Sequence, residues 1–373
     1  MRIEINNYIK HLPGFKTNRK ILVIESDDWG SNRMPSREVF EILKAKGITH
    51  DGIRYDKYDT LANETDLLEL YDVLNSVKDK NGNPAKMTAI SVVANPDFKK
   101  IEESGFREYH YEIFTETLRR RGETRVIDLW KQGINKGYFV PEFHGREHLN
   151  ITRWMKALRH RHEATCVAFK HGVYGITLKT PQNQEDSYLA AYDFYVPYEI
   201  DQLKEITIDG LNQFEKVFGF RSSYFVPPNG PLSREIHEIL FREGIKAIQT
   251  ARFIYSEPIG YGKFRKKLRY FGMKNKYGQI YTLRNVIFEP NEVPQLDLVK
   301  KCMIEIGQIF LWNKPVIISS HRVNYIGALH QENREHGLKL LKKLLIQVTK
   351  KWPDVEFLTS GELSSLILKE NNT

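Results

Sequence analysis

Two histidines four residues apart, His144 and His148, follow the apolar and aromatic run that begins at Tyr138. Imidazole is the commonest metal ligand in proteins, and a close pair of histidines can reach one ion. The alternative is that both lie on the first turn of a surface helix, and their spacing alone does not decide between the two interpretations. The pair becomes more informative when the rest of the chain supplies partners for it.

A pair of adjacent carboxylates, Asp27 and Asp28, ends the apolar run ILVIES that begins at Ile21. Neighbouring carboxylates repel each other unless a cation or a proton lies between them. The competing interpretation is a helix N-cap followed by a turn at Gly30. A third polar strand end is His321, which closes the run PVIISSH.

These strand ends and the 227–230 turn, Pro-Pro-Asn-Gly, would meet on one face of a parallel barrel. One carboxylate and two imidazoles make a ligand set with open positions, which suits a catalytic Zn²⁺ or a similar divalent ion. The second carboxylate could then act as a base, and the distant histidine could protonate a leaving group.

The elements that must position these residues alternate between strand and helix about seven times. Continuous β-branched runs such as 21–25 are typical of parallel strands buried on both faces. The pattern predicts the α/β class, as a parallel (β/α) barrel or an open sheet, with a helical insertion after the first strand at about residues 31–84. No linker or repeat divides the chain, so we expect residues 1–373 to form a single domain.

Composition excludes several classes of protein. Hydrophobic residues make up 41% and charged residues 28% of the chain, as in a globular protein. No apolar run approaches the roughly 20 residues of a membrane span, and residues 1–15 lack a secretory signal, so we expect a cytoplasmic protein. Two distant cysteines exclude a disulfide scaffold. The net charge of +9 is dispersed, which makes nucleic acid an unlikely partner.

The order of these motifs resembles that of the polysaccharide deacetylase family, the NodB-like carbohydrate esterases. ESDDWG at 25–30 resembles the family's Asp-Asp motif, and His144 with His148 resembles its His-Ser/Thr-x-x-His motif. The segment 226–230, Val-Pro-Pro-Asn-Gly, is similar to the third motif, and 318–321, Ile-Ser-Ser-His, is similar to the last.

This resemblance implies a distorted (β/α) barrel, usually with fewer than eight strands. It implies that Asp28, His144 and His148 hold the metal, most often zinc, while Asp27 is the catalytic base and His321 the general acid. The implied function is metal-dependent removal of an acyl group, such as acetyl, from a sugar or a related N-acyl or O-acyl compound. The alternatives are an amidase that cleaves a non-glycan C–N bond, and a degenerate barrel that binds carbohydrate without turnover.

The sequence departs from the family pattern at Val226, where the family usually has an arginine that pairs with the catalytic aspartate. Valine cannot hydrogen-bond, so we predict that another arginine points at Asp27. Arg146, between the two metal histidines, is the first choice, and Arg322 is the second. The alternative is that both arginines face solvent or bind substrate.

The expected partner is a carbohydrate or an N-acetylated small molecule. Residues expected to contact it are the polar or aromatic side chains near the strand ends: Trp29, Arg146, Pro228, Asn229, Arg284, Arg322 and Asn324. Each also has a structural interpretation, as a helix cap, a bridge between loops or, for Trp29, a plug at the mouth of the barrel.

Overall fold

The computed structural model of the chain describes residues 13–179, 185–194, 196–229, 232–260, 263–292 and 297–370. Its largest sheet has nine strands, and every pair of neighbouring strands in it is parallel. In spatial order these are β12 (Ile280–Thr282), β9 (Ala247–Gln249), β8 (Tyr224–Phe225), β5 (Phe139–Phe143), β2 (Met87–Ser91), β1 (Ile21–Trp29), β14 (Val316–His321) and β13 (Val286–Ile287), with β15 (Glu356–Phe357) beside β1.

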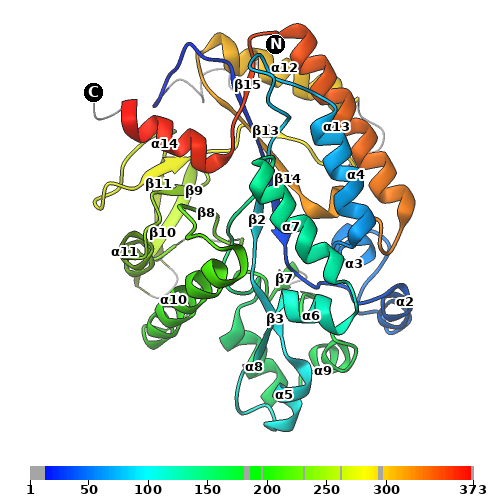
Figure 1. Cartoon of the computed structure of the whole chain (residues 1–373). Coiled ribbons are helices and arrows are strands. Elements are labelled where there is room, and N and C mark those ends of the chain that lie inside the picture. Colours follow the sequence, from blue (N-terminus) through cyan, green and yellow to red (C-terminus); the bar gives the residue numbers. More distant parts are fainter. Residues whose placement is uncertain are drawn as a thin grey trace.

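Helices follow most of these strands and pack outside the curled sheet (Figure 1). They are α2 (Arg37–Ala45), α3 (Arg54–Tyr58), α4 (Glu64–Asn75), α5 (Phe98–Glu103), α6 (Phe114–Arg120), α7 (Thr124–Lys136), α8 (Ile151–Arg159), α9 (Glu163–Lys170), α10 (Tyr198–Phe218), α11 (Arg234–Arg242), α12 (Leu298–Leu311), α13 (Gln331–Lys351) and α14 (Ser360–Glu370), with a 3₁₀ turn η1 at Arg322–Asn324. The predicted distorted (β/α) barrel is confirmed, with nine strands rather than about seven.

Three two-stranded sheets lie apart from the main sheet. They are the antiparallel pairs β3 (Ala94–Pro96) with β4 (Tyr111–Ile113), β6 (Thr177–Lys179) with β7 (Glu185–Ser187), and β10 (Phe253–Gly260) with β11 (Lys263–Leu268). The helices α2, α3 and α4 occupy the stretch between β1 and β2 where a helical insertion was expected. That the chain forms one domain stays a prediction.

The insertion is joined to the barrel through Asp66 in the first turn of α4. Asn63 and Asp66 form a reciprocal capping box, in which each side chain accepts a hydrogen bond from the other's backbone N–H. The Asp66 carboxylate also accepts hydrogen bonds from Arg334 on α13 and from the backbone N–H of Gly327, both at 2.8 Å. One carboxylate therefore starts α4 and fastens it to α13, and these two helices lie side by side in Figure 1.

The strand β1 lies in the middle of the sheet and is buried along its whole length. Its side chains alternate as the pleat requires: Leu22 and Ile24 pack into one apolar cluster, while Ile21 and Val23 pack into another. The pairing with β2 then shifts register between Ser26 and Trp29, as at a β-bulge. The bulge lies at the strand end that carries the two aspartates.

Trp29 is 1% exposed because the bulge turns it away from the barrel interior. Its ring packs edge-on against Trp130 and Phe139, and its indole N–H donates to Ser26 Oγ at 3.0 Å. Trp29 is therefore a core residue, and no face of its ring is open to a substrate, contrary to the expectation from sequence.

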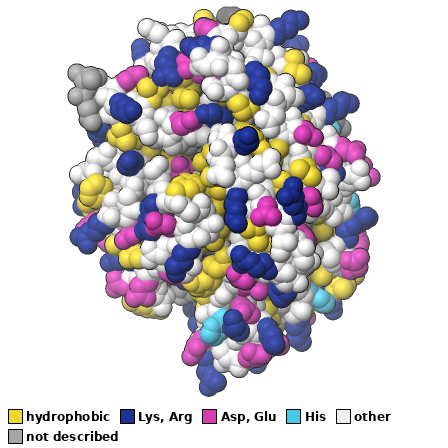
Figure 2. All heavy atoms as spheres, viewed as in Figure 1, with side chains coloured by type: hydrophobic (Ala, Val, Ile, Leu, Met, Phe, Trp, Pro, Cys, Tyr) yellow, Lys and Arg dark blue, Asp and Glu magenta, His cyan; other side chains and the backbone are white. Residues whose placement is uncertain are grey.

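The surface drawn in Figure 2 carries Lys and Arg side chains interspersed with Asp and Glu. This agrees with the dispersed charge of the sequence. None of the helices in the described ranges combines the length and the apolarity needed to cross a membrane.

A pair of helical glycines tests how tightly α13 packs against η1. A Cβ at Gly337 would lie 1.7 Å from the carbonyl oxygen of Asn324, whereas one at Gly307 on α12 would meet the Trp352 ring at 3.4 Å and Lys351 Nζ at 4.0 Å, which are ordinary contacts. We expect Gly337→Ala to lower the free energy of unfolding by about 1–3 kcal/mol or more through overpacking. Gly307→Ala should be neutral or stabilising, since alanine favours a helix by about 1 kcal/mol.

The measurement is the urea midpoint of each variant. Equal midpoints for Gly337→Ala and Gly307→Ala would show that the contact between α13 and η1 is looser than the structure indicates.

Candidate functional site

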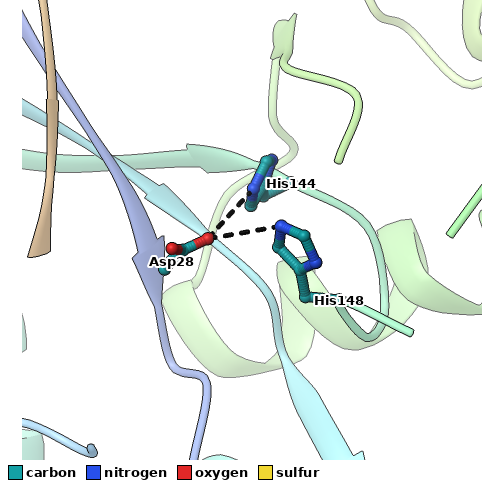
Figure 3. Close-up of side chains that lie close together, drawn as sticks. All are labelled: Asp28, His144 and His148. Carbon is teal, nitrogen blue, oxygen red and sulfur yellow. Dashed lines mark ion pairs between the residues drawn. The ribbon is translucent and has the colours of Figure 1, made fainter. Parts of the chain in front are cut away.

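Asp28, His144 and His148 form a buried cluster at the carboxyl ends of β1 and β5 (Figure 3). Asp28 Oδ1 lies 3.5 Å from His144 Nε2 and 3.4 Å from His148 Nε2. One ligand atom from each residue lies within 4.8 Å of the other two. The three residues that the sequence predicted as metal ligands are thus brought together with their donor atoms facing a common point.

The chemistry of the two imidazoles fits a metal ion. The Nδ1 of His144 lies 2.7 Å from the carbonyl oxygen of Val226, which can only accept, so Nδ1 carries the proton and Nε2 keeps its lone pair. That Nε2 is buried and finds no hydrogen-bond partner among the residues that the structure describes. Burial lowers the pKa of His148 to about 4 against the opposing charge of Asp28, so this ring is neutral at physiological pH. A divalent cation would satisfy both rings.

The loop between the two histidines depends on Gly145. Its φ is +104°, in a region that residues with a side chain rarely adopt, and an added Cβ would lie 3.3 Å from the backbone oxygen of Glu147. Asp28 is itself unusual, with φ +73°, a left-handed conformation that aspartate tolerates better than most residues. The positive φ at Asp28 occurs at one metal-ligand candidate, and the positive φ at Gly145 occurs in the loop between the other two, His144 and His148.

Asp27 is held by an arginine, but not by either of the two that were predicted. The guanidinium of Arg284, just after β12, donates to both Asp27 oxygens at 2.7 and 2.5 Å. Its Nε donates to Glu25 at 2.6 Å. Burial favours protonation of Asp27, but Arg284 outweighs that effect and holds the pKa below its usual range. The carboxylate is therefore ionised and fixed in direction by a two-point contact.

Arg146 and Arg322 point elsewhere, which corrects the prediction. Arg146 donates to Glu147 at 2.7 Å and to Asp209 at 2.8 Å. Arg322, which is fully buried, donates to Asp59 at 2.7 Å and to the carbonyl oxygen of Ser31 at 2.7 Å. Both arginines were chosen because they are close in sequence to His144, His148 or His321. Side chains that are neighbours in sequence can point to opposite faces of a barrel, so this closeness does not place them at Asp27.

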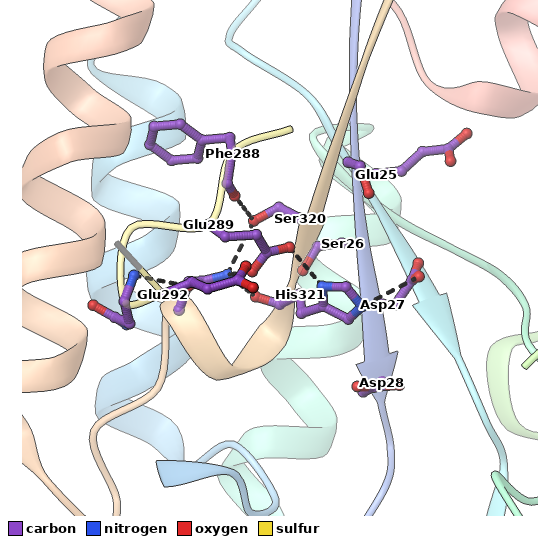
Figure 4. A network of polar contacts seen from close by, with 12 residues as sticks. Glu25, Ser26, Asp27, Asp28, Phe288, Glu289, Glu292, Ser320 and His321 are labelled. Carbon is purple, nitrogen blue, oxygen red and sulfur yellow. Dashed lines mark hydrogen bonds and ion pairs between the residues drawn. The ribbon is translucent and has the colours of Figure 1, made fainter. Parts of the chain in front are cut away.

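His321 lies between two carboxylates, as Figure 4 shows. Its Nδ1 is 2.6 Å from Glu289 and its Nε2 is 3.8 Å from Asp27. The parallel register of β1 and β14 places Asp27 directly beside His321. Burial would lower the pKa of His321, but the hydrogen bond and charge of Glu289 and the nearby aspartates raise it to about 9. His321 thus carries a proton at neutral pH.

Asn324 orients Glu289 and does not face a substrate. It is fully buried, and its amide donates to Glu289 at 2.7 Å, to the His321 carbonyl oxygen at 3.0 Å and to Ser320 at 3.2 Å. Arg54 from the insertion donates to the same Glu289 oxygen at 2.7 Å. The expectation that Asn324 binds substrate does not agree with this position.

A cavity of about 510 Å³ opens over these groups. Its described lining consists of Asp27, Asp28, Arg33, Tyr55, His144, His148, Val226, Pro227, Asn229, Leu232, His237, Ile248, Gln249, Thr250, Ala251, Arg269, Tyr281, Arg284 and His321. Of the residues expected to contact substrate, Asn229 and Arg284 are in this lining. Pro228 is buried and lies near Gly145, and Gly230 of the third motif lies outside the described residues.

Several residues of the site were missed from sequence: Glu25, Arg33, Tyr55 and Glu289. Glu25 gave a usable signal, because a carboxylate inside an otherwise apolar strand needs a buried partner. Glu289 is a carboxylate that follows a short strand, β13, and it could have been considered for the same reason. Arg33 and Tyr55 gave none, since they reach the cavity from the insertion, whose path depends on tertiary packing.

No known protein-family model matches the sequence, and no curated protein matches it either. The chain is similar in structure to a putative polysaccharide deacetylase from Mycobacterium smegmatis, at 9% identity and a TM-score of 0.47, over 97% of this chain and 94% of that one. A probable polysaccharide deacetylase from Pseudomonas aeruginosa PAO1 has 11% identity and a TM-score of 0.47, over 95% and 93%.

An allantoinase is a further structural neighbour, at 13% identity and a TM-score of 0.45, over 95% of this chain and 92% of that chain. At these sequence identities the structural likeness does not indicate a shared chemistry.

Metal content tests the ligand set. We expect the protein to retain about one Zn²⁺ per chain after dialysis, and His144→Ala or His148→Ala to lose most of it, because two protein ligands hold zinc poorly. Asp27→Asn should keep its zinc, since Asp27 is bonded to Arg284 and is not part of the cluster. Loss of zinc in Asp27→Asn, with retention in Asp28→Ala, would mean that the two aspartates have the opposite roles.

The pKa of His321 tests the role of Glu289. Glu289→Gln removes the negative charge that favours the protonated ring, so the pKa should fall from about 9 while burial continues to lower it. NMR titration of the imidazole in protein kept free of divalent ions would measure the change. Glu292→Gln is the matched control, because the Glu292 side chain is 57% exposed and contacts Arg54. Equal pKa values in the two variants would contradict this account.

Proposed function

We propose that the protein is a metal-dependent hydrolase that removes an acyl group, such as acetyl, from a sugar or a related compound. The observation that carries the proposal is a pair of ionic contacts at one cavity: Arg284 donates to both oxygens of Asp27, and His321 Nδ1 lies 2.6 Å from Glu289. Arg284 keeps Asp27 ionised, and Glu289 keeps His321 protonated. A base and an acid poised at the same pH are what hydrolysis of an amide or ester requires.

Asp28, His144 and His148 are the residues that would hold the metal, and a zinc ion there supplies Lewis-acid polarisation of the acyl carbonyl when bound. Asp27 accepts the proton of the attacking water, whose oxygen adds to the acyl carbon. Arg284, which donates to both Asp27 oxygens, holds this carboxylate in place at the cavity. The neighbouring His321 is 3.8 Å away, so both groups can act on one substrate.

His321 donates the second proton, to the nitrogen or oxygen of the leaving group as its bond to the acyl carbon breaks. Expulsion of an amine needs this proton more than expulsion of an alkoxide does. Glu289 stabilises the charged ring before transfer and keeps its Nε2 toward Asp27 through the bond at Nδ1. The proton on Asp27 then passes to the neutral His321 ring, whose Nε2 lies 3.8 Å from the carboxylate, and both groups return to their starting states. Over one cycle water therefore supplies the hydroxyl of the acid product and the proton of the released amine or alcohol.

Release of acetate tests the proposal. We expect the zinc-loaded protein to liberate acetate from at least one member of a panel of N-acetylated and O-acetylated sugars. Asp27→Asn should lower kcat by about 100- to 10,000-fold, the usual contribution of a general base, with zinc retained.

Asp209→Asn serves as the matched control, because Asp209 pairs with Arg146 outside the cavity. A zinc-loaded protein that binds these sugars and releases no acetate would favour the alternative of a carbohydrate-binding barrel without turnover. Turnover of a non-glycan amide alone would favour the amidase.

A further inference from the structure

The cavity contains a buried arginine that the proposed reaction does not use. Arg33 comes from the segment that follows β1, lines the cavity, and is 8% exposed. Among the described residues, no group accepts a hydrogen bond from it within normal distance, and its buried Nε has only an ion pair with Asp56 at 3.7 Å. A buried guanidinium with unused donors loses hydration without full compensation, so it favours an anionic ligand.

The surroundings of Arg33 fix its direction. Asn32, before it, donates its backbone N–H to the Asn95 side chain at 2.7 Å, and Met34, after it, donates to the Asp59 carbonyl oxygen at 3.0 Å. The guanidinium carbon lies 4.8 Å from the centre of the Tyr55 ring. With the backbone tethered on both sides and the head against an aromatic ring, the side chain is preorganised and loses little entropy on binding.

The nearest carboxylate does not use up the guanidinium. Asp56 Oδ1 lies 3.7 Å from Arg33 Nε, beyond a hydrogen bond, and Asp56 Oδ2 accepts from Thr49 at 2.6 Å. The contact is on the Nε side, and within the described part of the chain neither terminal amino group makes a hydrogen bond. These groups form the planar fork that suits a carboxylate or a phosphate.

The charge of the lining points the same way. Its described residues include three arginines and two aspartates. Arg284 is neutralised by Asp27 and Glu25, and Asp28 would be neutralised by the metal. Behind the wall, Arg33 is opposed by Asp56 at 3.7 Å, while the buried Asp59 is paired with Arg322. Tyr55, which contacts Arg33, also packs edge-on against His321 with ring centres 5.5 Å apart. The positive charge of Arg33 therefore lies close to the reacting groups, on the wall formed by the insertion.

We propose that the cavity selects an acidic substrate, an acylated sugar that carries a carboxylate, and that Arg33 binds this carboxylate through its terminal amino groups. The inference rests on the proposed function, because it names the substrate class of that same cavity. Arg33 is a specificity residue here, and the proton transfers remain with Asp27 and His321.

Calorimetric titration of the full-length, zinc-loaded protein with D-glucuronate and with D-glucose tests this, because these sugars differ by a carboxylate. We expect glucuronate to bind more tightly, and Arg33→Gln to weaken its binding by about 10- to 100-fold, the loss of a charged hydrogen-bond pair. Binding of glucose should not change. Arg37→Gln is the matched control, with the same change of charge on an exposed position of α2.

Arg33→Lys guards against misfolding of the glutamine variant, since it keeps the charge without the fork and should show an intermediate preference. Equal binding of the two sugars, no measurable binding of glucuronate, or equal effects of Arg33→Gln and Arg37→Gln would overturn the inference. Acetate release separates it from the proposed function. If the protein releases acetate but binds acidic and neutral sugars equally, only the role of Arg33 is contradicted. If it prefers acidic sugars but releases no acetate, only the proposed hydrolysis is contradicted.

Discussion

The largely buried guanidinium of Arg284, shared by Glu25 and Asp27, is the interaction on which the rest of the site depends. Removing one member of such a cluster leaves an uncompensated charge, which costs about 3–5 kcal/mol. Glu25 also accepts hydrogen bonds from Tyr224 on β8 and from Ser360 on α14. The direction of the Asp27 carboxylate is thus tied to the closure of the barrel, and strands distant in sequence contribute to it.

The convergence of the metal ligands could be predicted from sequence, because polar residues after parallel strands meet at one edge of a sheet. The neighbourhood of Asp27 and His321 follows from the same rule, since their strands pair in register. Arg284 could not be assigned to Asp27 in this way. Arg284 lies in the segment between β12 and β13, and it also donates to Ser319 on β14, the strand between β13 and β1. The contact therefore depends on the path of this connecting segment, which the strand pattern does not specify.

Val226 contributes to the metal half of the site through its backbone and not through its side chain. Its side chain stands where the resemblance led us to expect an arginine, and Arg284, between β12 and β13, supplies the guanidinium to Asp27 instead. As a backbone residue it still provides the carbonyl oxygen that fixes the tautomer of His144. The metal half of the site uses the backbone of this residue, while its buried side chain packs in an apolar cluster beside the cavity. The loss of one motif residue therefore says little about the ligand set, because backbone groups do not appear in a motif.

The side chains of Asp27, Asp28 and Trp29, consecutive in β1, lie in three different environments, whereas a regular pleated strand offers only two. Alternation would place Trp29 on the same face as Glu25 and Asp27, with Asp28 on the other. The bulge and the φ of +73° at Asp28 break this alternation, so that Asp27 meets Arg284, Asp28 meets the histidines and Trp29 enters the core. Strain of this kind persists only where the surroundings enforce it. Here the packing of Trp29 between Trp130 and Phe139 does so, because the indole cannot leave the core without moving Asp28.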